Sequence, residues 1–152
     1  MQNGVIMLVE TWTKDRIAAA TQFVAERISA DFAETGLTIE FRIDPDWSGP
    51  DGTSGPESVI AVRGGNESPL HLEGGTEQAC WYAAYQMQDD VIGEHGRPWP
   101  ELVDHSGAFV GVLSLASEAP EVAVWELDGR PFCAVGHLQR SCVSAGLTIR
   151  SF

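Results

Sequence analysis

The sequence predicts an α+β fold with two helices packed on one face of a mainly antiparallel sheet of five to six strands. Two long segments repeat apolar residues at three- and four-residue spacing, which is typical of amphipathic helices. Shorter β-type segments lie between and after them, and two glycine turns indicate hairpins. Both apolar helix faces are buried most simply against one sheet. We therefore expect residues 1–152 to form a single domain.

The two helices are expected over Thr13–Thr35 and Thr76–Gly93. Thr13 and Thr76 are the expected N-caps, and Gly36 is suited to a left-handed C-cap of the first helix. In the second helix, the expected inward stripe is Cys80, Ala84, Met87 and Val91, flanked by Trp81 and Tyr85. The residues expected to face water are Gln88, Asp89, Asp90 and Glu94.

Six segments are expected to form the strands. They are Leu37–Ile43, Ser58–Arg63, Pro69–Glu73, Ala108–Leu115, Glu121–Leu127 and Pro131–Val135. Ala108–Leu115 is nearly all apolar, which favours a well-buried strand. The turn Asp128-Gly129 is the strongest hairpin signal in the chain. Residues 139–152 have weak periodicity, so they are expected to add an edge strand or to form a loosely attached tail.

Acidic residues dominate the charge of the chain. It has 22 Asp and Glu against 9 Lys and Arg, a formal net charge of −13. Direct nucleic-acid binding is not expected, because it depends on cations that neutralise phosphates. A basic partner would be attracted instead. Alternatively, the charge serves only solubility.

The cysteine and hydropathy patterns favour a cytoplasmic protein. The three cysteines, Cys80, Cys133 and Cys142, are an odd number without close pairing, which does not suit a disulfide framework. The N-terminal apolar run has no preceding positive charge or cleavage-site pattern. No segment is long enough to cross a bilayer, so no membrane contact is expected. No cofactor is expected, and the oligomeric state stays open.

Motifs for catalysis are weak. A tetrahedral zinc site could in principle use Cys133, His137, Cys142 and His105. No Cys-x-x-Cys or His-Glu-x-x-His spacing occurs, so no metal is expected. His105, His137 and Cys133 would form a hydrolase or transferase site only if the fold brings them into one pocket. His71 and Glu73 could form an acid–base pair on one face of a strand.

A resemblance to a known family covers residues 79–138. The residues that carry it are Gln88-Asp89, Trp99-Pro100, Asp104-His105, Trp125 and Gly136-His137-Leu138. This order resembles small uncharacterised proteins of actinobacteria and their phages. In those proteins a helix with a Gln-Asp pair ends in a Trp-Pro step, and clustered histidines follow. The resemblance implies a fold and no particular activity.

The chain departs from that family where the family has metal-ligand residue types. Leu102-Val103 replaces a Cys-Pro step, Gly107 replaces a second histidine, and Leu127 replaces a cysteine. If these positions hold a metal in the family, this chain lacks most of the ligands.

These features favour a small acidic interaction protein of the immunity or inhibitor type that binds a basic protein partner. Trp47, in a long Gly- and Pro-rich loop, is the expected anchor, with Trp99 as a second one, because tryptophan is enriched at binding hot spots. The expected acidic rim that steers the partner is Asp44, Asp46, Asp51 and Glu57. The alternatives are a small hydrolase or transferase with a His/Cys site, or a small-ligand-binding domain.

Overall fold

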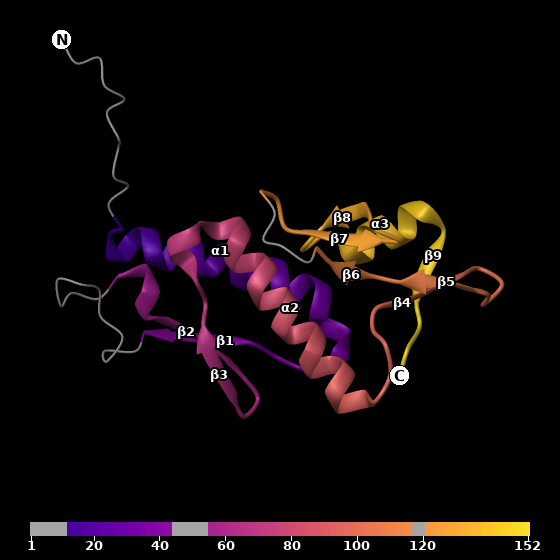
Figure 1. The fold of residues 1–152 in the computed structure, drawn as a ribbon, viewed down its shortest axis with the longest axis horizontal. Helices are drawn as coiled ribbons and strands as arrows, with labels where there is room; N and C mark the ends of the chain where they lie inside the picture. Colours follow the sequence, from indigo (N-terminus) through magenta and orange to yellow (C-terminus); the bar gives the residue numbers. More distant parts are fainter. Residues whose placement is uncertain (1–11, 44–54, 117–120) are drawn as a thin grey trace, which may run out of the picture.

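The computed structural model describes residues 12–43, 55–116 and 121–152, which form an α+β fold (Figure 1). Its helices are α1 (Lys14–Phe32), α2 (Thr76–His95) and α3 (Leu138–Ala145). Its strands are β1 (Glu40–Ile43), β2 (Val59–Arg63), β3 (Asn66–Pro69), β4 (Glu101–Asp104), β5 (Phe109–Val112), β6 (Ser114–Leu115), β7 (Val124–Leu127), β8 (Arg130–Ala134) and β9 (Leu147–Ile149). Trp47, Asp44, Asp46 and Asp51 lie outside the described residues, so their expected roles stay predictions.

Helix α1 follows its sequence pattern closely. The Thr13 side chain accepts a hydrogen bond of 3.1 Å from the backbone N–H of Arg16, which confirms the N-cap. The apolar residues that recur at three- and four-residue spacing on this helix are buried; they are Ile17, Ala20, Val24, Ile28 and Phe32. A short 3₁₀ turn precedes Gly36, whose φ of 81° is the left-handed conformation that glycine adopts without strain. Helix α2 differs at its start, where Gly75 and not Thr76 is the N-cap.

In the described ranges the strands form three separate three-stranded antiparallel sheets, so the expected single sheet of five to six strands is wrong. Their orders are β1-β2-β3, β5-β4-β9 and β6-β7-β8. The expected strand Ala108–Leu115 divides at Leu113, whose N–H donates to the carbonyl of Pro100 at 2.9 Å. β5 therefore pairs with β4, and β6 pairs with β7. β4 was missed because it is short and follows two prolines.

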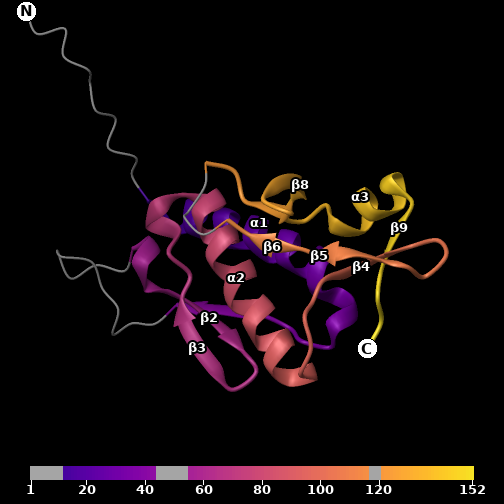
Figure 2. The same ribbon diagram turned by 45° about the vertical axis from the view of Figure 1, so that its right-hand side comes forward.

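The helix pair α1 and α2 lies between two β layers (Figures 1 and 2). Sheet β1-β2-β3 lies on one side of the pair, and β4 to β9 with α3 lie on the other. The expected placement of both helices on one face of one sheet is therefore wrong. Phe32 of α1, Trp99 and Trp125 of β7 meet in the core, with ring centroids 4.9 to 6.1 Å apart.

Two strand predictions need correction. The chain reverses at Gly64-Gly65, so β3 ends at Pro69, where the second strand of this hairpin was expected to begin. Leu70 and Leu72 are buried, but Leu72–Gly74 is a 3₁₀ turn and not part of a strand. In β5, Phe109 is 65% exposed, so this strand is not the well-buried one that its composition predicts. The Asp128-Gly129 hairpin is confirmed, with φ values of 53° and 78°.

The C-terminal residues pack on the rest of the chain. Helix α3 buries Leu138 and Cys142, and β9 pairs with β4 as an edge strand. The expected edge strand is thus confirmed for Leu147–Ile149, and the loosely attached tail is wrong. The helix was not predicted, because its eight residues are too few to show a clear period.

Candidate functional site

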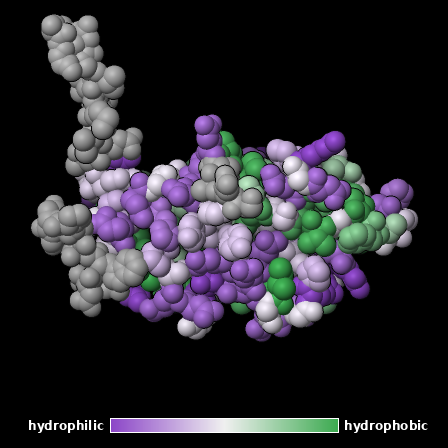
Figure 3. Space-filling view, viewed as in Figure 1, coloured by the Kyte–Doolittle hydropathy of each residue, from purple (hydrophilic) through white to green (hydrophobic). Residues whose placement is uncertain are grey.

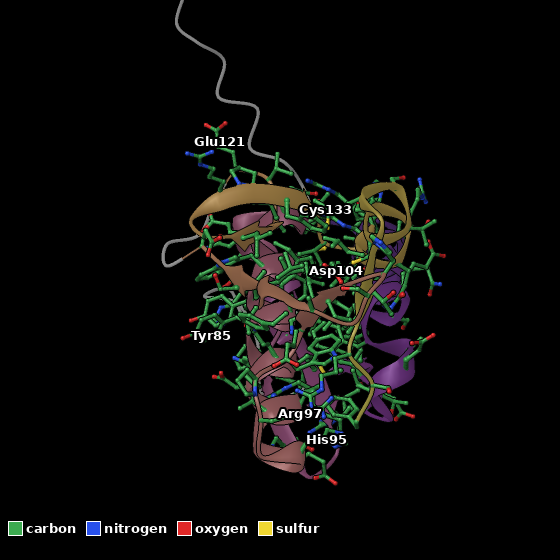
Figure 4. The ribbon with its side chains drawn as sticks, turned by 90° about the vertical axis from the view of Figure 1, so that its right-hand side faces the viewer. Tyr85, His95, Arg97, Asp104, Glu121 and Cys133 are labelled. Atoms are coloured by element: carbon green, nitrogen blue, oxygen red, sulfur yellow. The ribbon has the colours of Figure 1, made fainter. Side chains whose placement is uncertain are left out.

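The outer side of α2 carries an aromatic and acidic surface. We define the α2 outer face as Trp81, Tyr82, Tyr85 and Asp89. Residues three and four apart are neighbours on a helix surface, so Tyr82, Tyr85 and Asp89 adjoin one another. Tyr85 is 45% exposed and points away from the ribbon in Figure 4, and Asp89 is exposed. In Figure 3, polar residues cover most of the middle of the molecule, where α2 lies in front.

The aromatic rings of this face are held by contacts with one another. The Trp81 ring lies 5.3 Å from the Tyr82 ring, edge to face, and 5.8 Å from the Tyr85 ring. The Trp81 indole Nε1 donates to the Ala116 carbonyl at 2.9 Å, and His71 packs on Tyr82 at 4.3 Å. Trp81 and Tyr82 are half-buried. The rings therefore form an apolar surface of fixed geometry beside the Asp89 carboxylate.

A groove of about 320 Å³ adjoins the C-terminal end of this face. We call it the acidic groove; its lining residues are Leu37, Arg63, Gly64, Gly65, Asn66, Asp89, Asp90, Gly93 and Glu94. The Arg63 side chain, 9% exposed, is ion-paired with Asp90 and donates to the carbonyl of Gln86. Within the described ranges no ion pair engages Asp89 or Glu94, and both are exposed. The groove thus presents two uncompensated carboxylates.

Among the described residues, the most buried carboxylate belongs to Asp31 of α1, which is 1% exposed. It accepts hydrogen bonds from Trp125 Nε1 at 2.8 Å and from the N–H groups of Gly136 and Leu138 at 2.6 and 3.0 Å. Burial raises the pKa of the Asp31 carboxyl, and these hydrogen bonds offset only part of that rise. A carboxylate satisfied by three fixed donors is a structural junction and has no room for a substrate.

Beside it, Arg27 of α1 pairs with Glu77 of α2 through both guanidinium Nη atoms. The Arg27 Nε donates to the carbonyl of Val135 at 2.8 Å, and Glu77 accepts from the N–H of Ala123 at 3.0 Å. Burial raises the pKa of Glu77, but the hydrogen bonds from Arg27 and Ala123 outweigh it and leave this pKa lowered. This pair joins both helices to the β layer that contains β4 to β9.

The catalytic candidates lie on three different segments of the described chain. His105 is exposed in the turn after β4, whose Asp104 pairs with Leu147, just after α3. His137 is exposed immediately before α3. Cys133 is half-buried on β8. In the described part of the chain, no group of three or more His, Cys, Asp or Glu residues could hold a metal ion.

The three thiols are free and poorly suited to nucleophilic attack. Burial raises the pKa of Cys80 to about 12, and burial also raises that of Cys133 to about 12 and increases that of Cys142. A nucleophilic cysteine needs a lowered pKa. His71 and Glu73 do meet, at 3.3 Å between Nδ1 and Oε1, but His71 lies in a left-handed turn and not on a strand.

Two expected surface residues are part of the interior. Trp99 is 3% exposed and packs on Phe32 and Trp125, so its expected role as a partner-binding anchor is wrong. Gln88 is 9% exposed, and its Nε2 donates to the carbonyls of Trp99 and Leu113 at 2.9 Å each. The Gln-Asp and Trp-Pro steps thus have a structural purpose, because Gln88 ties α2 to the chain that follows it. Glu57 is half-buried in a 3₁₀ turn.

A second groove lies between α1 and the β1-β2 edge. Its volume is about 680 Å³, and its mainly apolar lining includes Ile17, Thr21, Phe41, Ile43 and Val59. Lys14 and Arg42 also line it. An apolar groove of this size is suited to part of a small molecule.

Comparison with known proteins adds no assignment: no protein-family model matches the chain, and no curated protein and no solved structure is significantly similar to it. The resemblance of residues 79–138 to small actinobacterial and phage proteins therefore stays a prediction. Within the described ranges, no helix has both the length and the apolar character needed to span a membrane.

The α2 outer face was not recognised from the sequence. The sequence pattern places Trp81 and Tyr85 beside the buried stripe and predicts no contact for Tyr82. The signal was available, since Tyr82, Tyr85 and Asp89 follow three- and four-residue spacing on the side opposite Cys80, Ala84 and Val91. Aromatic residues on the polar side of an amphipathic helix indicate an exposed contact surface.

Proposed function

We propose that the chain is an acidic cytoplasmic interaction protein that binds a basic protein partner, in the manner of an immunity or inhibitor protein. The distribution of charge carries this proposal. Of the 9 Lys and Arg residues, Arg27, Arg42, Arg63 and Arg150 are ion-paired with the chain's own carboxylates. Four of the nine cations are thus paired within the protein, while carboxylates such as Asp89 and Glu94 are exposed.

Such a surface accelerates association with a basic partner and makes the association sensitive to salt. Dissolved salt strongly weakens the attraction between exposed charges on the two partners. The Debye length falls from about 30 Å at roughly 0.01 M salt to about 3 Å at roughly 1 M. The three free thiols are compatible with the reducing cytoplasm.

The test is a calorimetric titration of the protein with an oligoarginine peptide, with an oligoglutamate peptide of equal length as control. We expect saturable binding of oligoarginine at roughly 0.01 M salt, which is lost at roughly 1 M, and no binding of oligoglutamate. Absence of oligoarginine binding at low salt would contradict the proposed function, and so would binding that salt does not weaken.

The groove between α1 and the β1-β2 edge favours a second candidate, a small-ligand-binding domain. Its apolar lining with Lys14 beside it suits an aliphatic carboxylate. Native mass spectrometry with added medium-chain fatty acids tests this candidate. A one-to-one complex that is weakened by Ile17→Asp supports it, and no complex at any concentration rejects it. The hydrolase or transferase alternative has less support, because burial raises the pKa of the Cys133 thiol to about 12.

A further inference from the structure

We infer that the α2 outer face, together with the acidic groove, is the surface that receives the basic partner, and that it binds an arginine-bearing segment. This inference rests on the proposed function and assigns it a place on the molecule. Arginine side chains of the partner stack on Tyr85 and Trp81, and their guanidinium groups pair with Asp89 and Glu94.

The helix geometry places the two kinds of contact side by side. Asp89 lies one turn after Tyr85 on the same side of α2, and it also lines the acidic groove. A segment lying along the helix therefore passes from aromatic rings to carboxylates without leaving the surface. The Trp81 ring is fixed by its hydrogen bond to Ala116 and packs against the exposed ring of Tyr85.

The charge at the groove is complementary to a cation. Arg63 already neutralises Asp90, which leaves the carboxylates of Asp89 and Glu94 to meet an incoming charge. The opposite rim is the Gly64-Gly65 turn, and no atom lies within 4 Å of the position where a side chain would begin on either glycine. The groove is thus open on this side, and a long side chain can enter it.

The chemistry of the surface favours arginine over lysine. A planar guanidinium stacks on aromatic rings and binds a carboxylate through two parallel hydrogen bonds. The lysine ammonium is a compact and strongly hydrated charge, so it gains less from the rings. Phe109 on β5 is also exposed, but within the described part of the chain it has no aromatic ring stacked beside it, unlike Tyr85.

The test compares two double variants that change the net charge equally. Asp89→Asn with Glu94→Gln removes the two carboxylates of the site, and Glu26→Gln with Glu121→Gln removes two exposed carboxylates elsewhere. Oligoarginine affinity at low salt is expected to fall about tenfold in the first variant, as for two close charge pairs, and less than about twofold in the second.

A second comparison tests the rings. Tyr85→Ala is expected to lower oligoarginine affinity about fivefold and to reduce the preference for oligoarginine over oligolysine, while Phe109→Ala leaves both unchanged. Circular dichroism checks that each variant is folded; if Tyr85→Ala is not, Tyr85→Leu replaces it, since it keeps apolar bulk without the ring.

The outcomes separate the two proposals. Equal losses in the two double variants, with an unchanged peptide preference in the Tyr85 variant, would overturn the inference while leaving the proposed function in place. If the unaltered protein does not bind oligoarginine at all, the proposed function fails and the inference fails with it. Selective loss in the α2 variants supports both.

Discussion

The carboxylate of Asp31 accepts a hydrogen bond of 2.8 Å from the indole Nε1 of Trp125, which lies 94 residues further along the chain. The same carboxylate accepts from the N–H groups of Gly136 and Leu138, so one α1 side chain holds both β7 and the start of α3. This junction connects the helix pair to the second β layer. The α2 outer face owes its fixed position to such connections.

Replacing Asp31 tests this junction. In Asp31→Ala, three N–H donors lose their acceptor in a buried site, and each lost partner carries a desolvation cost. We expect the free energy of unfolding to fall by about 3 kcal/mol or more, measured by urea denaturation. Glu34→Ala, at an exposed position just after the same helix, is the control and should change stability by less than about 0.5 kcal/mol. Similar losses of unfolding free energy in Asp31→Ala and Glu34→Ala would contradict the structural importance of the Asp31 hydrogen bonds.

The Arg27–Glu77 pair predicts a pH dependence. The pKa of Glu77 is lowered on folding from its ordinary value of 4.5, so the unfolded chain binds this proton more readily than the folded protein. The stabilisation by Glu77 is therefore fully present above pH 4.5 and is lost as pH falls through the folded pKa. Unfolding measured at pH 7 and at pH 3 should show a stability difference between the unaltered protein and Glu77→Gln that shrinks at pH 3. A difference that grows on acidification would be the contrary result.

Trp99 and Tyr85 should respond oppositely to truncation. Trp99 is 3% exposed and Tyr85 is 45% exposed. Trp99→Ala leaves a cavity beside Phe32 and Trp125 and should destabilise the protein by about 3–5 kcal/mol, whereas Tyr85→Ala should cost less than about 1 kcal/mol. Thermal unfolding followed by circular dichroism measures both. If Tyr85→Ala proved as destabilising as Trp99→Ala, Tyr85 would be a packing residue and not a contact surface.

The thiols should resist modification in the folded protein. Burial raises the pKa of all three, to about 12 for Cys80 and Cys133, so almost no thiolate exists at pH 8. Mass spectrometry after brief iodoacetamide treatment should find no adduct on the native protein and three adducts in guanidinium chloride. Rapid native labelling of Cys133 would revive the cysteine nucleophile that the fold otherwise disfavours.

The elements predicted well from the sequence are those that local chemistry determines. The period of Ile17 to Phe32, the Thr13 cap and the Asp128-Gly129 turn depend on nearby residues, and all are confirmed. The division into three sheets depends on Leu113 and Gln88, whose hydrogen bonds reach other segments. The spacing of apolar residues along the chain carries no information about hydrogen bonds between distant segments.

The candidate site shows the same limit. The net charge predicted a basic partner from composition alone, but the burial of Trp99 follows from its contact with Trp125, 26 positions away in the sequence numbering. The exposure of Tyr85 likewise depends on which side of α2 the β layers cover. Aromatic residues next to the apolar stripe of a helix can be buried or exposed, and the packing of the other elements on the helix determines which.

A nuclear magnetic resonance titration of isotope-labelled protein with unlabelled oligoarginine at low salt tests directly whether α2 receives the arginine-bearing segment. We expect the largest amide shifts on α2 between Trp81 and Glu94 and at the Gly64-Gly65 turn. The indole signal of Trp81 should shift as well, whereas the buried indole of Trp125 should not. Shifts spread evenly over the acidic residues, or concentrated on β5 and α3 with α2 unchanged, would contradict it.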